Sequence, residues 1–195
     1  MYSSPNSDQD IVFSIYKDKR TVFRLNDIAL LVGETDFQSL NKRLNYYVHT
    51  GKLFNPRKGI YTKPDYNPEE LACLIYTPSY ISLEYVLQKS GVIFQYDSGI
   101  TTVSYLSRSI EVNGRSFRFR KIKGEILVHP AGIIRQQDHI NIASAERAFV
   151  DLLYLNTRYY FDNLNPLNKK TVYNLLSIYQ SNTLSVRVKK LLQDG

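Results

Sequence analysis

Cysteine, tryptophan and long apolar runs are scarce or missing in this chain of 195 residues, and each absence removes a class of protein. The single cysteine, Cys73, cannot form an internal disulfide, and its apolar neighbours predict a buried side chain. No apolar run approaches the roughly 20 residues that span a bilayer. The polar N-terminus also lacks the basic start and apolar core of a signal peptide. We therefore expect a cytoplasmic protein with no membrane contact.

Familiar metal and catalytic motifs are also missing. The three histidines, His49, His129 and His139, have no metal-ligand spacing, and a chain with one cysteine rarely holds structural zinc. The glycine-rich phosphate loops, the nucleophile elbow and the zinc-protease motif are absent, and no acid is followed two residues later by lysine. We expect no catalytic residue, no metal and no cofactor, and hence no enzyme. The acids left to test for nucleotide or nucleic-acid chemistry are Asp97, Glu125, Glu146 and Asp151.

The overall composition is that of a folded globular protein with an excess of positive charge. Hydrophobic residues make up 43% and charged residues 22% of the chain, and 25 Lys and Arg outnumber 18 Asp and Glu. A net charge of +7 is compatible with a polyanionic partner. The length allows one or two domains. Two prolines, Pro64 and Pro68, lie in a polar stretch, which predicts a first domain over residues 1–66 and a second over residues 67–195.

The first domain has the pattern of three helices and a hairpin. Apolar spacing predicts helices around residues 11–16 and 25–32, with a short strand at 21–23 between them. Thr35 and Gln38 are spaced as a capping box for a third helix, which Gly51 would end. Residues 53–62 then form a hairpin with a turn at 55–59. This order predicts a winged helix-turn-helix domain.

The third helix and the hairpin carry side chains suited to DNA. Amide and guanidinium groups can bridge adenine and guanine in the major groove, and the helix N-terminus would direct its positive dipole at phosphate. Residues 36–63 hold six basic residues and one acid, so charge is concentrated here. The alternative interpretation is a solvated polar helix face. The candidate DNA contacts are Gln38, Ser39, Asn41, Lys42, Arg43, Asn45, Arg57, Lys58 and Lys63.

The second domain alternates short helices and strands, so the predicted fold class is α+β with a compact C-terminal α/β domain. Strands are expected at residues 100–106, 110–112, 116–122, 125–129 and 133–142, and Asn113-Gly114 marks a tight hairpin. Ser82 and Ser144 are expected to cap helices. Two further helices, around residues 169–179 and 184–193, close the chain.

A second group of basic residues lies on this hairpin. Phe117 and Phe119 alternate with Arg118 and Arg120, which predicts one apolar face and one basic face. Such charges can solvate the sheet and protect its edge, or they can bind RNA, DNA or an acidic partner. The residues of this second basic surface are Arg108, Arg115, Arg118, Arg120 and Lys121.

Three stretches resemble the AbiEi family of antitoxin regulators from type IV toxin–antitoxin and phage-defence operons. The first is the hairpin, with Gly51-Lys52-Leu53 and Arg57-Lys58-Gly59-Ile60-Tyr61. The second is Pro78-Ser79-Tyr80-Ile81-Ser82-Leu83-Glu84-Tyr85-Val86-Leu87 with Gly91-Val92, and the third runs from Ile142 to Leu153. The resemblance covers nearly the whole chain, although the C-terminal part is compact beside the longer members.

The resemblance implies a winged-helix domain that binds double-stranded DNA at the protein's own operator, with inverted repeats expected there. It also implies a C-terminal domain that counters a nucleotidyltransferase-like toxin without a tight complex. Tyr80 and Ser82 are interpreted as a packing aromatic and an N-cap. Glu146, Arg147 and Asp151 are interpreted as neighbouring charges on one helix, with a structural or a toxin-neutralising role. We expect a monomer or a weak dimer.

Two other functions remain open on the sequence. The chain could be a solitary winged-helix regulator without antitoxin activity. It could also be a module for RNA or protein, in which the winged helix docks a partner and the 115–123 hairpin binds.

Overall fold

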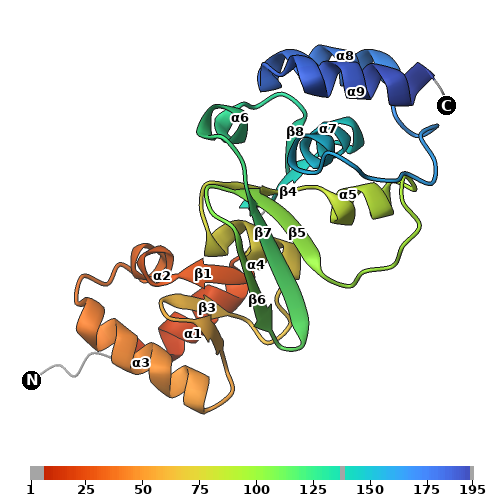
Figure 1. Ribbon diagram of the computed structural model, residues 1–195. Coiled ribbons are helices and arrows are strands. Elements are labelled where there is room, and N and C mark those ends of the chain that lie inside the picture. The colour runs from red at the N-terminus through yellow and green to blue at the C-terminus, as the bar shows by residue number, and fades with distance from the viewer. Residues whose placement is uncertain (1–6, 137–138, 194–195) are drawn as a thin grey trace, which may run out of the picture. The chain divides into compact units, whose positions relative to one another are not determined.

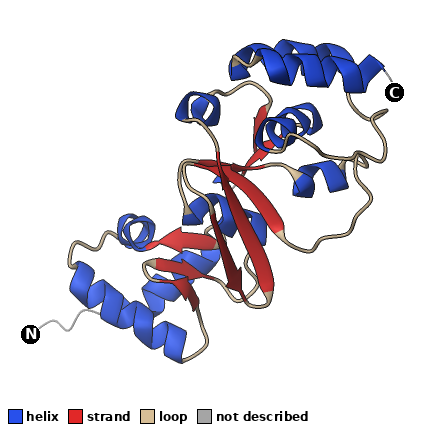
Figure 2. Ribbon diagram, viewed as in Figure 1, coloured by secondary structure: helices blue, strands red, loops and turns tan. Residues whose placement is uncertain are grey.

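A computed structural model describes residues 7–136 and 139–193, with side chains described from residue 11 onward. The fold is mixed α+β and separates into two compact units, Met1–Leu71 and Ala72–Gly195 (Figure 1). Figure 2 marks the strands in red; they form one sheet of three strands and one of six. No helix in the described ranges is both long enough and apolar enough to cross a membrane.

The first unit combines three helices with a small antiparallel sheet. The sheet has the strand order β1-β3-β2, so the N-terminal strand pairs with the second strand of the hairpin. Ile15, Phe23, Leu40 and Leu44 are completely buried in the core between the helices and the sheet. The elements are α1 (Ser7–Lys17), β1 (Val22–Arg24), α2 (Leu25–Val32), α3 (Phe37–His49), β2 (Phe54–Arg57) and β3 (Ile60–Thr62).

The start of α3 differs from the predicted capping box. Asp36 is the N-cap, and its carboxylate accepts hydrogen bonds from the backbone N–H groups of Gln38 and Ser39. Thr35 instead donates its backbone N–H to Glu34. An aspartate one residue later in the chain can satisfy two amides of the first turn at once, so the helix begins at Phe37.

The first unit extends past the predicted boundary at residue 66. Glu70 lies in α4 (Pro68–Ile75) and is 3% exposed. Its carboxylate accepts hydrogen bonds from the N–H and hydroxyl of Thr21, at 2.8 and 2.6 Å, and from the N–H of Val22 at 3.1 Å. These bonds tie the first turn of α4 to β1, and the division between the two units falls within α4, after Leu71.

The second unit is built on a six-stranded mixed sheet with the order β6-β7-β5-β4-β9-β8. The pairs β4–β9 and β5–β7 are parallel and the others antiparallel. Asn113 and Gly114, with φ values of 51° and 74°, form the predicted tight turn between β6 and β7. The strands are β4 (Ser79–Ile81), β5 (Ile100–Ser104), β6 (Arg108–Val112), β7 (Arg115–Lys121), β8 (Ile133–Arg135) and β9 (Asn141–Ala143).

Helices cover the face of this sheet that carries Tyr80. Tyr80 contacts Asp151 of α7 (Ala145–Leu155), and α8 and α9 contact α7 in turn. The opposite face carries Phe117 and Phe119, and the ring of Tyr76 lies against Phe119. The remaining helical elements are α5 (Glu84–Lys89), α6 (Gly124–Val128), α8 (Lys169–Leu175), the 3₁₀ helix η2 (Leu176–Tyr179) and α9 (Asn182–Gln193).

Two local predictions in the second unit are wrong. Residues 125–129 lie in and after α6 rather than in a strand, and the adjacent Ile126 and Leu127 are both buried. A strand would direct consecutive side chains to opposite faces, whereas one helical turn buries both on the same side. Leu83, not Ser82, is the N-cap of α5. The Ser82 hydroxyl bonds to Asp151 instead.

Candidate nucleic-acid interface

One side of α3 presents a row of exposed polar side chains. Gln38, Lys42 and Asn45 are all exposed and follow one another at spacings of four and three residues, so they share one face of the helix. Leu40 and Leu44 are fully buried on the other side. The structure therefore gathers three of the candidate contacts in a single row that faces away from the core of their own unit.

Backbone N–H groups at the N-terminus of α3 are already hydrogen-bonded to carboxylates of the same chain. Asp36 holds the backbone N–H groups of Gln38 and Ser39, and the Glu34 carboxylate accepts from the N–H groups of Thr35 and Asp36. Two carboxylates thus neutralise the positive end of the helix dipole. The expectation that this end binds phosphate does not fit this arrangement.

Arg43 is directed back toward the loop before α3. Its guanidinium forms an ion pair with Glu34, and both side chains are partly exposed. The backbone N–H of Asp36 is the main group that lowers the pKa of Glu34, with a smaller effect from Arg43. Arg43 therefore links the helix to the preceding loop, while its Nε has no hydrogen-bond partner within the described residues.

The hairpin ends in a compact tip. Lys58 is exposed at the turn, and Gly59 adopts a left-handed φ of 77° that favours glycine. The Asn55 side-chain amide donates to the carbonyl oxygens of Arg57 and Ile60, at 2.9 and 2.7 Å, and so bridges the two strands. Arg57 is half-buried beside this bridge. The tip is thus held rigidly and carries one exposed lysine.

Three other predicted DNA contacts are less available. Two form hydrogen bonds within the first unit, and the third is half-buried. The Lys63 ammonium donates to the carbonyl oxygen of Asp18 at 2.6 Å. The Asn41 side-chain oxygen accepts from the hydroxyl of Tyr61 at 2.7 Å, although Asn41 is otherwise exposed. Ser39 is half-buried. The exposed row of α3 and the hairpin tip are consequently the best-presented part of the predicted set.

The second basic surface is divided between the two faces of the sheet. In β7, Arg118 and Arg120 share the face of Tyr80, because paired residues of neighbouring strands point to the same side. Arg115 and Lys121 point to the face of Phe119, and the pairing of Arg108 with Phe119 places Arg108 there too. These five residues therefore do not form one continuous basic face.

The two arginines on the Tyr80 face have partners within the second unit. Arg118 forms an ion pair with Asp97, which lowers the pKa of that carboxyl. Arg120 donates to the side-chain oxygen of Asn156 at 3.3 Å. Both arginines link β7 to neighbouring loops.

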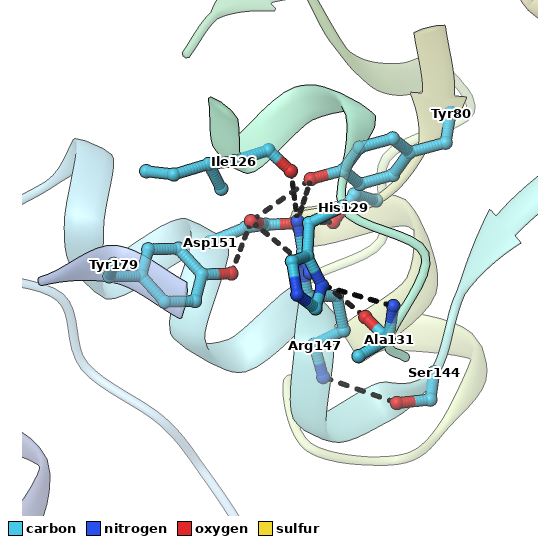
Figure 3. A network of polar contacts seen from close by, with 9 residues as sticks. Tyr80, Ile126, His129, Ala131, Ser144, Arg147, Asp151 and Tyr179 are labelled. Carbon is cyan, nitrogen blue, oxygen red and sulfur yellow. Dashed lines mark hydrogen bonds and ion pairs between the residues drawn. The ribbon is translucent and has the colours of Figure 1, made fainter. Parts of the chain in front are cut away.

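The most extensive polar cluster lies inside the second unit and was not predicted. Arg147 and Asp151 of α7 are 0% exposed and pair through Nε and Oδ1 at 3.3 Å (Figure 3). Tyr80, Ser82 and Tyr179 also donate hydroxyl hydrogen bonds to the Asp151 carboxylate, the shortest being 2.6 Å from Tyr179. Three segments distant in sequence thus converge on one carboxylate.

Arg147 makes further hydrogen bonds, so that all three guanidinium nitrogens donate. Nη1 donates to the carbonyl oxygen of Ala131 at 2.9 Å, and Nη2 donates to that of Ile126 at 2.7 Å and to the Tyr80 hydroxyl at 3.1 Å. Burial raises the pKa of Asp151, and Arg147 together with the hydroxyl donors opposes that shift. Burial also raises the pKa of Tyr80, which keeps this hydroxyl protonated as a donor.

The sequence pattern around α7 contained a signal for this burial. The run around Asp151 is filled by the apolar residues Ala148, Phe149, Val150, Leu152 and Leu153, and a helix that is apolar on all sides belongs to a core. In the structure every residue from Arg147 to Leu153 is buried. Charged residues at i and i+4 within such a run indicate a buried pair rather than a surface one. The partners Tyr80, Ser82 and Tyr179 could not be paired with them from spacing, because they lie 28 to 71 residues from Asp151.

Comparison with known proteins identifies a fold but no family. The chain is similar in structure to the RV2827C protein from Mycobacterium tuberculosis, with a TM-score of 0.60 and 13% sequence identity. The match covers 99% of this chain and 78% of that one. No protein-family model matches the chain, and no curated protein does so. At this identity the likeness concerns the fold alone.

Proposed function

We propose that the first unit is a winged-helix domain that binds double-stranded DNA, with α3 in the major groove and the β2–β3 hairpin as the wing. The observation that supports this best is the exposed row of Gln38, Lys42 and Asn45 on α3. Amides and a lysine are side chains that hydrogen-bond to base edges. The exposed Lys58 at the hairpin tip is suited to phosphate.

We further propose that the chain represses its own operon and acts as an antitoxin of the AbiEi type against a nucleotidyltransferase-like toxin. The support is the resemblance of the hairpin, of the Pro78–Val92 stretch and of the Ile142–Leu153 stretch. Two of these stretches contain Tyr80, Ser82, Arg147 and Asp151, which form the buried network. In this proposal the shared residues maintain the fold of the second unit.

DNA binding can be tested with fluorescently labelled duplex DNA from immediately upstream of the gene. Affinity should fall with salt, with a log–log slope of about −0.9 for each phosphate contact. Lys58→Ala should weaken binding on all sequences and reduce the slope, whereas Asn45→Ala should relax discrimination between operator and scrambled duplexes. Lys19→Ala, which removes an exposed lysine outside α3 and the hairpin, is the matched control.

Unchanged affinity in a Gln38, Lys42, Asn45 and Lys58 quadruple alanine variant would refute the DNA interface. The antitoxin role needs a separate measurement, which is growth rescue when the chain is co-expressed with the product of the adjacent toxin gene. Rescue by the quadruple variant would separate neutralisation from DNA binding.

A further inference from the structure

The second unit contains a cleft beside the buried network. The cleft has a volume of about 250 Å³ and lies between α6, the segment after it and the Tyr80 face of the sheet. Leu127 and Val128 of α6 form one apolar wall, and Tyr80 and Ile133 of the sheet form the other. The Val128 side chain is 68% exposed. The residues that line the cleft include Tyr80, Leu127, Val128, His129, Arg135 and Asn141.

The wall of this cleft is held in place by Arg147. The carbonyl oxygens of Ile126 and Ala131 both accept from this guanidinium, and they lie on either side of residues 127–130, which line the cleft (Figure 3). Tyr80, on the sheet side, is fixed by the same guanidinium and by Asp151. A buried cation that donates from all three of its nitrogens therefore preorganises both sides, and a rigid wall lowers the entropy lost on binding.

Three polar groups at the cleft are available for a ligand. Within residues 7–136 and 139–193, the Arg135 guanidinium and the Asn141 side-chain amide make no hydrogen bond or ion pair. His129 accepts the N–H of Ala131 on Nδ1 at 3.3 Å, which leaves Nε2 for another partner. Apolar walls with a few convergent polar groups are the usual composition of a small-molecule site.

We propose that this cleft binds a small organic anion with a compact apolar body, such as an aromatic carboxylate. Arg135 is exposed at the cleft and offers a planar fork that matches a carboxylate. Leu127 and Val128 contact the body of the ligand, while His129 and Asn141 fix its orientation. The volume is below the range of drug-sized sites, which selects ligands the size of a single substituted ring. This site is independent of the DNA binding proposed for the other unit.

The test is a titration of the full-length ¹⁵N-labelled chain, followed by amide chemical shifts, with benzoate as the probe. Saturable shifts confined to residues 79–81, 126–136 and 141–143 are expected, with a Kd on the order of 1 mM, as suits so small a ligand. Benzyl alcohol has the same aromatic ring as benzoate but no charge, and inorganic phosphate is an anion without an apolar ring. Each should bind at least tenfold more weakly than benzoate.

Surface variants keep the test independent of folding. Arg135→Gln should weaken benzoate binding at least tenfold, and Val128→Glu should do so by adding a negative charge at the cleft. Arg158→Gln, which alters an exposed arginine outside the cleft, is the matched control and should leave the Kd unchanged. Non-saturating shifts, an unchanged Kd in Arg135→Gln, or equal binding of benzyl alcohol or phosphate would each overturn the proposal.

Discussion

Tyr179 donates a 2.6 Å hydrogen bond to the Asp151 carboxylate and so joins η2 to the middle of α7. The carboxylate is 0% exposed and also faces the buried guanidinium of Arg147. Removing one partner of a buried ion pair leaves the other charge without compensation. The relation between these residues therefore predicts a strong dependence of folding on Asp151.

Asp151→Ala should lower the free energy of unfolding by about 3–5 kcal/mol, because Arg147 keeps its charge without its carboxylate. Tyr179→Phe should lower it by about 2 kcal/mol, since one hydrogen bond to a charged group is lost. Urea unfolding followed by circular dichroism measures both, with Tyr160→Phe, which alters an exposed tyrosine, as control.

The double replacement Arg147→Met with Asp151→Leu separates the effect of the two charges on stability from the effect of the volume that the side chains fill. Apolar residues of similar volume often substitute for a buried pair at little loss, so the double variant should be more stable than Asp151→Ala alone. A double variant less stable than the single one would contradict this explanation.

Glu70→Ala should open the junction between β1 and α4. The substitution removes the acceptor of three hydrogen bonds and leaves the N–H of Val22 buried without a partner. We expect a loss of about 2–3 kcal/mol and faster hydrogen exchange at the Thr21 and Val22 amides. Asp65→Ala, which changes an exposed acid nearby, should leave both amides protected.

Acidification should weaken the start of α3 through Glu34. The pKa of this carboxyl is lowered in the folded state, chiefly by the N–H of Asp36 and also by Arg43. A group with a lowered folded pKa stabilises the fold above its unfolded pKa, and that contribution is lost as the pH falls through the folded value. A ¹³C NMR titration of the Glu34 carboxyl should therefore give a midpoint below the ordinary glutamate value.

Arg43→Gln isolates the contribution of the arginine to this shift. The Glu34 midpoint should rise in the variant but stay below the ordinary value, because the backbone N–H groups of Thr35 and Asp36 still donate to the carboxylate. An unchanged midpoint would show that the ion pair does not form in solution.

Local sequence patterns predicted most helices, strands and turns. Where a local prediction failed, a partner distant in sequence explains the failure. The Asn113-Gly114 turn and the burial of Phe117 and Phe119 follow from spacing alone and are confirmed. The α+β class is confirmed as well. Ser82 has the residue type of an N-cap, but a carboxylate 69 residues away binds its hydroxyl instead.

In the candidate interface too, local spacing could not reveal side-chain partners that are distant in sequence. The helical spacing of Gln38, Lys42 and Asn45 correctly places them on one exposed row. Spacing could not show that Arg43 turns back to Glu34 or that Lys63 binds a carbonyl oxygen of the α1–β1 loop. Each of those partners lies in a different segment, so only the folded arrangement brings them together.

Gly132→Ala should be the most damaging glycine substitution in the second unit. Gly132 has a φ of 75°, and an added Cβ would lie 2.8 Å from the Cβ of Arg147 and 3.3 Å from Cδ2 of Leu175. The left-handed conformation alone costs about 1–2 kcal/mol for a residue with a Cβ, and the contact with Arg147 adds to this because a Cβ atom cannot move without its helix.

The matched control is Gly114→Ala. Gly114 has nearly the same φ, 74°, but an added Cβ there meets no atom within 4 Å, so this variant measures the conformational effect by itself. Thermal unfolding should show a loss of about 1–2 kcal/mol for Gly114→Ala and a clearly larger loss for Gly132→Ala. Equal losses would mean that the segment carrying Gly132 yields to the new methyl group, and that Arg147 does not fix the wall of the cleft as rigidly as its hydrogen bonds indicate.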